Sequence, residues 1–434
     1  MKSATPKVMH AVAGLPILGH VIAAVRAAGV ERIVVVTHKE GEEVRAFAAK
    51  LGATSVIQEK QLGTGHAAAM ASDVLKDFSG AVMVAYGDMP LLTAATFEAS
   101  FAAQTRAGMA MVGFRPSDPA AYGRMILDGQ GLLERIVEFK DADAAERAVD
   151  LCNAGILTAD AKSFFRWANK LENGNAQGEY YLTDIPVLAK AEGVRCAVVV
   201  ADEVEMMGVN SRAELAAAEA AMQMRLRARA LANAVGMTAP ETVFLSHDTV
   251  LEADCQIDPY VVFGPGVVVH SGAYIRAFSH LEGADVGTGA IVGPYARLRP
   301  GAVLEESVHV GNFVEVKKTR LEKGAKANHL TYLGDARVGA GANIGAGTIT
   351  CNYDGFEKHL TDIGAGAFIG SDTALVAPVK VGDGAIVGAG SVITRDVGAG
   401  ALVVVRAEQK EIPGWAEKFR TRKKAAKAAK AKDK

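Results

Sequence analysis

The chain has 434 residues, of which 50% are apolar and 22% are charged, with a formal net charge of -2. This length exceeds that of one ordinary domain, so we expect two or three domains. The near-neutral charge argues against a nucleic-acid binder, and because no apolar run approaches about 20 residues we expect no membrane span.

The four cysteines are widely spaced and form no CxxC pair; they are Cys152, Cys196, Cys255 and Cys351. This pattern is typical of free thiols in a reducing compartment. The opening residues, MKSATPKVMH, lack the apolar core of a signal peptide. We therefore expect a cytoplasmic protein.

Short apolar runs alternate with helix-period segments in the first half. The runs that predict buried strands are residues 32–37, 55–58, 81–86 and 110–114. The segments that predict helices are residues 17–28, 41–51, 65–75 and 94–104. Residues 123–158 are richer in strand signals, and 194–201 predict another strand. Strand–helix alternation favours right-handed crossovers and a mostly parallel sheet.

A strong helix is predicted over residues 211–234. Ser211 lies three positions before Glu214, the spacing of a capping box, and Ala and Leu dominate the segment. Its apolar stripe is weak, so we expect a linker helix between two domains.

The second half changes to a six-residue period of apolar residues. The repeating positions are Leu251, Ile257, Phe263, Val269, Ile275 and Leu281, then Val286, Val292, Leu298, Leu304, Val310 and Val316, then Tyr332, Val338 and Ile344, and finally Ile363, Ile369, Leu375, Val381, Val387 and Ile393. Such a period predicts a triangular coil of short parallel strands with these side chains inside. Residues 317–331 and 351–362 break the period, and we expect both to leave the stack as loops that carry binding groups.

The chain ends in a basic stretch, residues 418–434. It has no apolar face, so we interpret it as a disordered, solvated tail rather than a nucleic-acid arm.

Several motifs resemble one family along nearly the whole chain. In the first half they are PKV (6–8), QLGTGH (61–66), YGDMP (86–90), YGR (122–124), IVE (136–138), NAG (153–155), GEYY (178–181) and GVN (208–210). In the second half the run 311–354 includes HLTYLGD and NYD. Together they resemble bifunctional N-acetylglucosamine-1-phosphate uridylyltransferase/glucosamine-1-phosphate N-acetyltransferase.

This resemblance implies an α/β fold class in four parts. They are a Rossmann-like nucleotidyltransferase domain (1–210), a linker helix (211–234), a left-handed parallel β-helix of hexapeptide repeats (235–405) and a C-terminal segment with the basic tail (406–434). The family enzyme acetylates glucosamine-1-phosphate with acetyl-CoA, then transfers UMP from UTP to N-acetylglucosamine-1-phosphate. It feeds peptidoglycan and lipopolysaccharide synthesis, and its catalytic unit is a homotrimer.

The resemblance assigns acetyl-transfer roles in the second half. His329 matches the catalytic base, because imidazole accepts a proton near neutral pH. The residues that match sugar-phosphate contacts are Arg299, Lys317, Tyr332, Asn343 and Lys358. The residues that match the acetyl-CoA cleft and the loop beside it are Ala346, Asn352, Tyr353, Ser371, Ala389 and Arg406. We interpret Arg297, two positions before Arg299, as a bystander.

In the first half the resemblance assigns the UTP and UDP-N-acetylglucosamine site. Lys7 matches a phosphate contact, Gln58, Gly63 and Thr64 match uracil contacts, and Gly123, Glu138 and Asn153 match sugar contacts. The other matching residues are Tyr86, Gly87, Asp88 and Asn210. Asp88 and Asn210 match the ligands of Mg²⁺, which prefers oxygen donors.

One family feature is missing from the sequence. The family begins with an apolar strand and a glycine-rich loop that cradles the UTP phosphates, and Met1 aligns with the end of that loop. We expect unpaired strand edges in the sheet and poor uridylyl transfer by these 434 residues. Either the natural protein starts further upstream, which we favour, or only the acetyltransferase is active.

Two further alternatives remain from the sequence. One is a different sugar-phosphate nucleotidyltransferase with a hexapeptide tail, which would not need the HLTYLGD and NYD segments. The other is a non-enzymatic subunit that binds nucleotide sugars, in which replacement of His329 would change nothing.

Overall fold

The computed structural model describes residues 1–119, 122–175 and 177–432. The chain forms two compact units. The first contains Met1–Asn233, Ala239–Thr249 and Phe263–Pro265, and the second contains Ala234–Thr238, Val250–Val262 and Gly266–Lys434. No helix in the described part of the chain is long and apolar enough to span a membrane.

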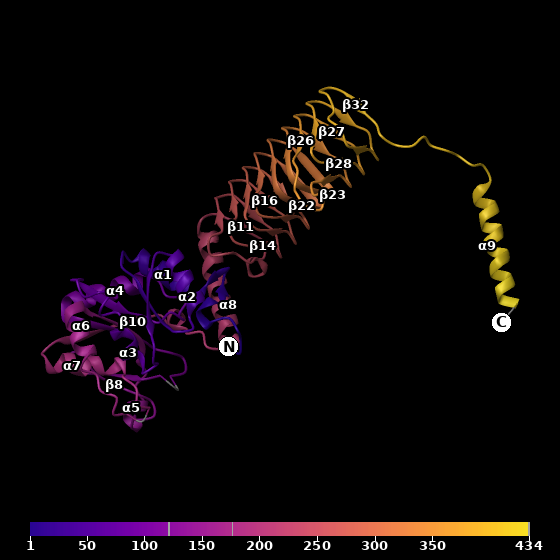
Figure 1. Cartoon of the computed structure of the whole chain (residues 1–434). Helices are drawn as coiled ribbons and strands as arrows, with labels where there is room; N and C mark the ends of the chain where they lie inside the picture. The colour runs from indigo at the N-terminus through magenta and orange to yellow at the C-terminus, as the bar shows by residue number, and fades with distance from the viewer. Residues whose placement is uncertain (120–121, 176, 433–434) are drawn as a thin grey trace. The chain divides into compact units, whose positions relative to one another are not determined.

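The first unit is an α/β domain (Figure 1). Its strands are β1 (Ala11–Val12), β2 (Leu15–Pro16), β3 (Val34–His38), β4 (Thr54–Gln58), β5 (Ala81–Val84), β6 (Gly108–Phe114), β7 (Arg124–Leu127), β8 (Leu133–Val137), β9 (Cys152–Asp160) and β10 (Arg195–Ala201). Its α-helices are α1 (Ile17–Ala27), α2 (Glu42–Lys50), α3 (Thr64–Ala69), α4 (Ala94–Ala107), α5 (Ala144–Arg147), α6 (Ala161–Ala168), α7 (Ile185–Ala191) and α8 (Arg212–Ala232). Its 3-10 turns are Lys7–Met9, Leu182–Asp184, Glu203–Met206 and Pro240–Thr242.

The main sheet of this unit has the order β10-β6-β9-β7-β8, with β5 paired to β9. The prediction of a mostly parallel sheet is wrong. Among the described strands of this unit only β3–β4 and β10–β6 pair in parallel. Strand β9 runs antiparallel to β5, β6 and β7, because the β7–β8 hairpin reverses the chain before β9 enters the sheet.

Strands β3 and β5 lie in separate sheets. In the described part of the chain β3 pairs only with β4, and β5 pairs only with β9. Each of these two strands therefore has one unpaired edge among the described residues.

Strand β6 organises the core because it is apolar on both faces. Met109 and Met111 pack into a cluster with Phe164 and Trp167 of α6. Val112 and Phe114 belong to a second cluster, with Phe97 of α4. Fully burying side chains of this size contributes about 1.5–3 kcal/mol each. The rigid sheet carries the loops that hold the candidate site.

Helix α8 begins with the predicted capping box, which is confirmed. The Ser211 hydroxyl accepts from the Glu214 N–H at 3.1 Å, and Glu214 Oε2 accepts from the Ser211 N–H at 2.8 Å. Further along, the buried Gln223 amide exchanges two hydrogen bonds with the backbone of Leu245, at 2.7 and 2.9 Å. These bonds fix the segment around Leu245 to the helix within the first unit.

The second unit is a stack of short parallel strands wound in coils (Figure 1). The strands are β11 (Gly236–Met237), β12 (Val250–Leu251), β13 (Gln256–Ile257), β14 (Val262–Phe263), β15 (Val268–Val269), β16 (Tyr274–Ile275), β17 (His280–Leu281), β18 (Ala284–Val286), β19 (Ile291–Val292), β20 (Arg297–Leu298), β21 (Ala302–Leu304), β22 (His309–Leu321), β23 (Lys326–Val338), β24 (Asn343–Ile344), β25 (Ile349–Cys351), β26 (Thr361–Ile363), β27 (Phe368–Ile369), β28 (Ala374–Val376), β29 (Val379–Val381), β30 (Ile386–Val387), β31 (Val392–Ile393) and β32 (Leu402–Val403).

Most of the short strands pair with the third strand along the chain, as in β13–β16, β16–β19 and β27–β30. Three strands therefore complete one coil, and the predicted three-sided β-helix is confirmed. The apolar register forms continuous columns: Ile257 pairs with Ile275, Ile275 with Val292, and Val292 with Val310. All four side chains are at most 1% exposed.

One register position is wrong. Tyr332 was predicted to point inward, yet its neighbour Leu333 is the buried residue, and Tyr332 is half-buried. The cause is a short step in the repeat: the buried residues Leu333 and Val338 are five positions apart, so counting back six positions from Val338 gives Tyr332. Because side chains alternate along a strand, a shift of one residue exchanges inside and outside.

Residues 317–331 do not form the loop that we expected. They lie largely within the long strands β22 and β23, which pair along most of their length. The coil turns its corners there through single left-handed residues, with φ of 57° at Phe313, 45° at Lys318 and 49° at Leu330. A corner made by one residue keeps the chain in the stack.

Within the predicted loop 351–362, residues 352–360 do leave the stack. They connect β25 to β26 and close through an antiparallel bridge between Tyr353 and Lys358. Beyond the coils, Trp415–Lys432 form helix α9, where we expected a disordered tail. The sequence there is rich in Ala, Lys and Arg, which are strong helix formers.

Candidate functional site

In the first unit, Lys7, Asp88 and Asn210 come together from distant parts of the sequence. The Lys7 ammonium lies 2.6 Å from Asp88 Oδ2 and 2.8 Å from Asn210 Oδ1. The GVN segment is held to the YGD segment because the Val209 N–H donates to the Asp88 carbonyl at 3.0 Å. Two predicted metal ligands therefore converge on one cation.

The donor set fits a magnesium site. A carboxylate oxygen and an amide oxygen converge on one point, and Mg²⁺ commonly takes few protein oxygens and completes its shell with phosphates and water. The described residues contain no cluster of three or more His, Cys, Asp or Glu side chains suited to a metal.

Tyr86 lies beside this group, in the turn after β5. Burial, followed by the charges of Asp88 and Glu138, raises the pKa of its phenol. The Thr64 side chain hydrogen-bonds to it. Gly155, with φ of 74°, lies against the ring: a Cβ there would be 2.1 Å from a ring carbon of Tyr86. The NAG glycine is therefore required for the position of the tyrosine.

The QLGTGH loop is braced by the backbone of Tyr180. Tyr180 donates to the Leu62 carbonyl and accepts from the Gly65 N–H, each at 2.8 Å. Gly63 has φ of 107°, and a Cβ there would lie 2.6 Å from the Tyr180 carbonyl. The Gln58 amide reaches the Gly63 carbonyl at 3.2 Å, so the three predicted uracil contacts, Gln58, Gly63 and Thr64, form one group.

The predicted sugar contacts also lie together. The Asn153 N–H donates to the Gly123 carbonyl at 2.9 Å, and a Cβ on Gly123 would lie 3.4 Å from both Glu138 carboxylate oxygens. Burial, with the nearby charges of Asp141 and Asp184, raises the pKa of Glu138. Gly87 lies between Tyr86 and Asp88, so all predicted residues of this half are in the first unit.

In the second unit, His329 lies exposed on β23 and is oriented by Asn312. His329 Nδ1 is 2.9 Å from Asn312 Oδ1, and the two residues are register partners on adjacent coils. An amide oxygen only accepts, so Nδ1 carries the proton and Nε2 of the neutral ring is unprotonated. This arrangement suits a general base.

His329 belongs to a column of residues along one edge of the stack. The coil after it places Ala346 in the same position, since the Gly347 N–H donates to the Leu330 carbonyl. Hydrogen bonds between the next coils continue the column. The Ala346 carbonyl accepts from the Asp372 N–H at 2.7 Å, and the Ser371 carbonyl accepts from the Gly390 N–H at 2.8 Å. The Ala389 carbonyl accepts from the Arg406 guanidinium at 2.9 Å. The column therefore contains His329, Ala346, Ser371, Ala389 and Arg406.

Three cationic side chains gather nearby. The Lys358 ammonium, then burial and Arg299, lower the pKa of Lys317, which places Lys317 beside both other groups. Arg299 Nη1 is held by Glu315 Oε1 at 2.7 Å, and Arg297 contacts the other oxygen of Glu315 at 3.6 Å. Such a cluster is suited to a phosphate dianion.

Tyr332 and Asn352 border this cluster. A Cβ on Gly334 would lie 2.3 Å from the Tyr332 hydroxyl and 2.9 Å from Asn352 Nδ2, so the two side chains meet over that glycine. The same Asn352 amide donates to Asp335 at 2.5 Å. Tyr353, in the protruding loop, donates to the Gly355 carbonyl at 2.6 Å.

Asn343 is not part of this group. It lies on the side of the coil formed by the register partners His309 and Lys326. Tyr332 instead pairs with Ile349 on another side. Within one chain, Asn343 is therefore separated from the cationic cluster.

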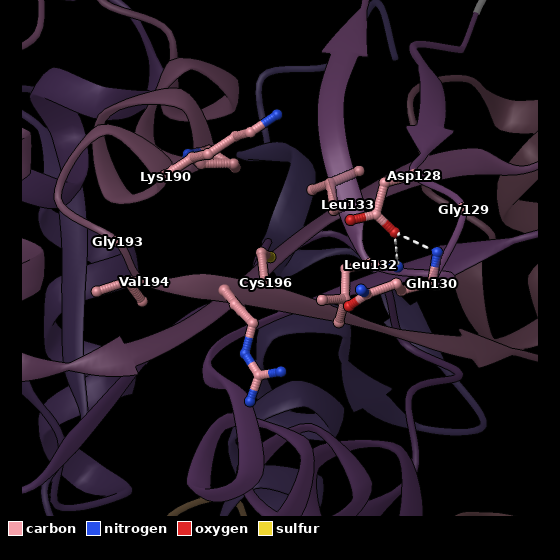
Figure 2. A pocket seen from close by; sticks show the side chains of 11 residues that line it. Asp128, Gly129, Gln130, Leu132, Leu133, Lys190, Gly193, Val194 and Cys196 are labelled. Atoms are coloured by element: carbon pink, nitrogen blue, oxygen red, sulfur yellow. Dashed lines mark hydrogen bonds between the residues drawn. The ribbon is translucent and has the colours of Figure 1, made fainter.

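A surface hollow of about 550 Å³ lies elsewhere in the first unit and contains none of the predicted site residues. Figure 2 shows Asp128 bonded back to its own turn, where it accepts from the N–H groups of Gln130 and Leu132 at 2.8 and 3.0 Å. Lys190, also in its wall, pairs with Glu134 at 3.3 Å. These two charges are already satisfied, and the hollow is not a candidate site.

Three residues of these sites were not predicted from the sequence: Asn312, Glu315 and Tyr180, the last of which acts through its backbone. Asn312 and Glu315 were visible in the GNFVEVKK segment. Their role depends on which residues face each other on adjacent coils, and only the 17-residue offset reveals it.

Both halves of the chain are similar to known transferase domains. Residues 1–151 match the MobA-like NTP transferase domain, and residues 248–283 and 361–395 match the bacterial transferase hexapeptide repeat. The chain is 57% identical to the bifunctional protein GlmU of Acidiphilium cryptum over 426 residues, 98% of this chain and 96% of that protein. It is 55% identical to that of Ruegeria sp. over 434 residues, with 100% and 96% covered. Identity to that of Paramagnetospirillum magneticum is 52% over 433 residues, with 99% and 96% covered.

Similarity of this extent, across both domains, shows that the chain belongs to the family of bifunctional GlmU proteins, which join a nucleotidyltransferase domain to a hexapeptide-repeat acetyltransferase domain.

Proposed function

We propose that this chain makes UDP-N-acetylglucosamine in two steps. The second unit transfers acetyl from acetyl-CoA to glucosamine-1-phosphate. The first unit then transfers UMP from UTP to N-acetylglucosamine-1-phosphate and releases pyrophosphate. The observation that carries the proposal is the column on the β-helix, which aligns His329 with four residues assigned to acetyl-CoA.

In acetyl transfer, the sugar amine attacks the thioester carbon while His329 Nε2 accepts its proton. The C–S bond then breaks, and the coenzyme thiolate leaves and is protonated. Asn312 holds the ring with Nε2 free for this role. Arg299, Lys317 and Lys358 bind the sugar phosphate, which fixes the amine relative to the base.

In uridylyl transfer, a phosphate oxygen of N-acetylglucosamine-1-phosphate attacks the α-phosphorus of UTP, and pyrophosphate leaves in line. Gln58, Gly63 and Thr64 bind the uracil, while Gly123, Glu138 and Asn153 bind the sugar. Lys7 binds phosphate. Mg²⁺, held by Asp88 and Asn210, neutralises phosphate charge when it is bound.

We further propose that three copies assemble side by side through their β-helices. A ladder of stacked aromatic rings runs along one corner: Tyr260, Phe278, Tyr295 and Phe313, with centroids 4.9–5.4 Å apart. Each ring is about half exposed in the single chain, so the ladder offers an apolar strip to a neighbour. The separation of Asn343 from the cationic cluster also supports sites completed by a second copy.

The cytoplasm, where UTP and acetyl-CoA are available, is the proposed location. The four free cysteines support it. The convergence of Lys7, Asp88 and Asn210 favours two activities over an acetyltransferase alone.

Two assays on the full chain test the proposal. Release of the coenzyme thiol reports acetyl transfer, and pyrophosphate release from UTP reports uridylyl transfer. His329→Ala should abolish acetyl transfer and leave uridylyl transfer unchanged. Asp88→Asn should abolish uridylyl transfer and leave acetyl transfer unchanged. His280→Ala, an exposed histidine on β17, is the control that should change neither. Normal acetyl transfer by His329→Ala would contradict the proposal.

A further inference from the structure

Lys7 has an interaction that phosphate binding does not explain. Its ammonium contacts both proposed metal ligands at once, at 2.6 Å from Asp88 Oδ2 and 2.8 Å from Asn210 Oδ1. Without a nucleotide it is therefore the counterion of the carboxylate. The Lys7 side chain is 38% exposed, so it is free to move away through solvent, whereas the Asp88 side chain is 20% exposed.

We infer that Lys7 is an internal substitute for the divalent cation and competes with it for Asp88 and Asn210. The inference rests on the proposed function of these two residues as metal ligands. A magnesium ion binds oxygen at about 2.0–2.1 Å. The ammonium nitrogen is within hydrogen-bond distance of the same two oxygens, so both cations cannot occupy this position. Their like charges also repel at such short range.

The nucleotide resolves this competition. A triphosphate offers Lys7 several anionic oxygens, which draw the ammonium away from Asp88. The vacated oxygens then accept the cation that accompanies the phosphates. Lys7 thereby makes metal binding depend on nucleotide binding, and it keeps the two ligands together in the resting enzyme.

The test is a titration of the full chain with Mn²⁺ in the absence of nucleotide, with free Mn²⁺ followed by electron paramagnetic resonance. Lys7→Met removes the charge and keeps the length of the side chain, and it should tighten Mn²⁺ binding about tenfold. Lys7→Arg keeps a cation and should bind Mn²⁺ as weakly as the wild type. Lys190→Met removes a similar ion pair elsewhere in the unit and should have no effect.

The double variant Lys7→Met with Asp88→Asn assigns the site, because it should lose the tightened binding. If Lys7→Met binds Mn²⁺ as tightly as the wild type or more weakly, and the binding still depends on Asp88, the competition by Lys7 is overturned but the metal site is not. Mn²⁺ binding that is indifferent to Asp88 in every variant overturns the metal assignment and this inference with it. Neither result affects the acetyl-transfer assay, which tests the second unit separately.

Discussion

Asn312 and His329 face each other across two adjacent coils, with the amide oxygen 2.9 Å from Nδ1 of the imidazole. The bond leaves Nε2 as the basic nitrogen on the exposed edge of the stack. The two residues are 17 positions apart in the sequence, which is one full coil. The base is therefore positioned by the coil length itself.

Removing the Asn312 side-chain oxygen, which accepts the hydrogen bond from His329, should reduce acetyl transfer without unfolding the protein. We expect Asn312→Ala to lower kcat by about 10–100-fold, because the ring loses its orientation and preferred tautomer. Asn312→Asp restores an acceptor and adds a negative charge that stabilises the protonated imidazole. The acidic limb of its pH–rate profile should therefore move to higher pH. A profile identical to that of the wild type would show that Asn312 has only a structural role.

The cationic cluster should lower the folding stability of the protein when no substrate is bound. Lys358 is the main cause that lowers the pKa of Lys317, so the folded protein binds the Lys317 proton less tightly than the unfolded chain does. Stability therefore rises with pH between the lowered pKa and the ordinary value of 10.5. Lys358→Met should remove this rise and increase the melting temperature at pH 8.

The same substitution should weaken substrate binding. We expect Lys358→Met to raise KM for glucosamine-1-phosphate about tenfold, because a charged hydrogen bond to phosphate is lost. Lys380→Met, which removes an exposed lysine from the same unit, is the control. An unchanged KM would mean that the phosphate binds elsewhere.

Gly155 should separate the two activities. Gly155→Ala places a Cβ 2.1 Å from the Tyr86 ring, so the ring must move. Uridylyl transfer should fall about 100-fold, while acetyl transfer should persist. Gly193→Ala is a matched control: Gly193 has a similar φ of 78°, but no atom lies within 4 Å of its added Cβ. Equal losses in both variants would indicate backbone strain rather than displacement of Tyr86.

The β-helix core should behave like the core of a globular protein. Leu298 is fully buried in the stack, and Leu298→Ala should lower the free energy of unfolding by about 2–5 kcal/mol. Val250→Ala, at a side chain that is 49% exposed, should cost much less. Urea unfolding followed by circular dichroism measures both. Similar losses would place Leu298 outside the stack.

Much of this fold was predictable because the six-residue period has a single geometric solution. Apolar columns such as Ile275–Val292–Val310 follow directly from it. Tyr332 escaped the prediction because the step between the buried residues Leu333 and Val338 is five positions instead of six. The corner residues Phe313 and Leu330 were not predictable either, because bulky residues rarely adopt a positive φ.

In the first unit the strands were predictable but their directions were not. The apolar runs locate β3 to β6, whereas the antiparallel position of β9 depends on the β7–β8 hairpin. The site residues were identified one by one through family motifs. Their partners were not, because contacts such as Lys7 with Asn210 join residues 203 positions apart.

Acetyl-CoA should bind along one edge of the β-helix and end at His329. A crystal structure of the full chain with coenzyme A would show whether it does. We expect the coenzyme to lie along Ala346, Ser371 and Ala389, with its phosphates near Arg406 and its thiol end toward His329. A coenzyme bound on another side of the coil, with its sulfur remote from His329, would contradict the claim.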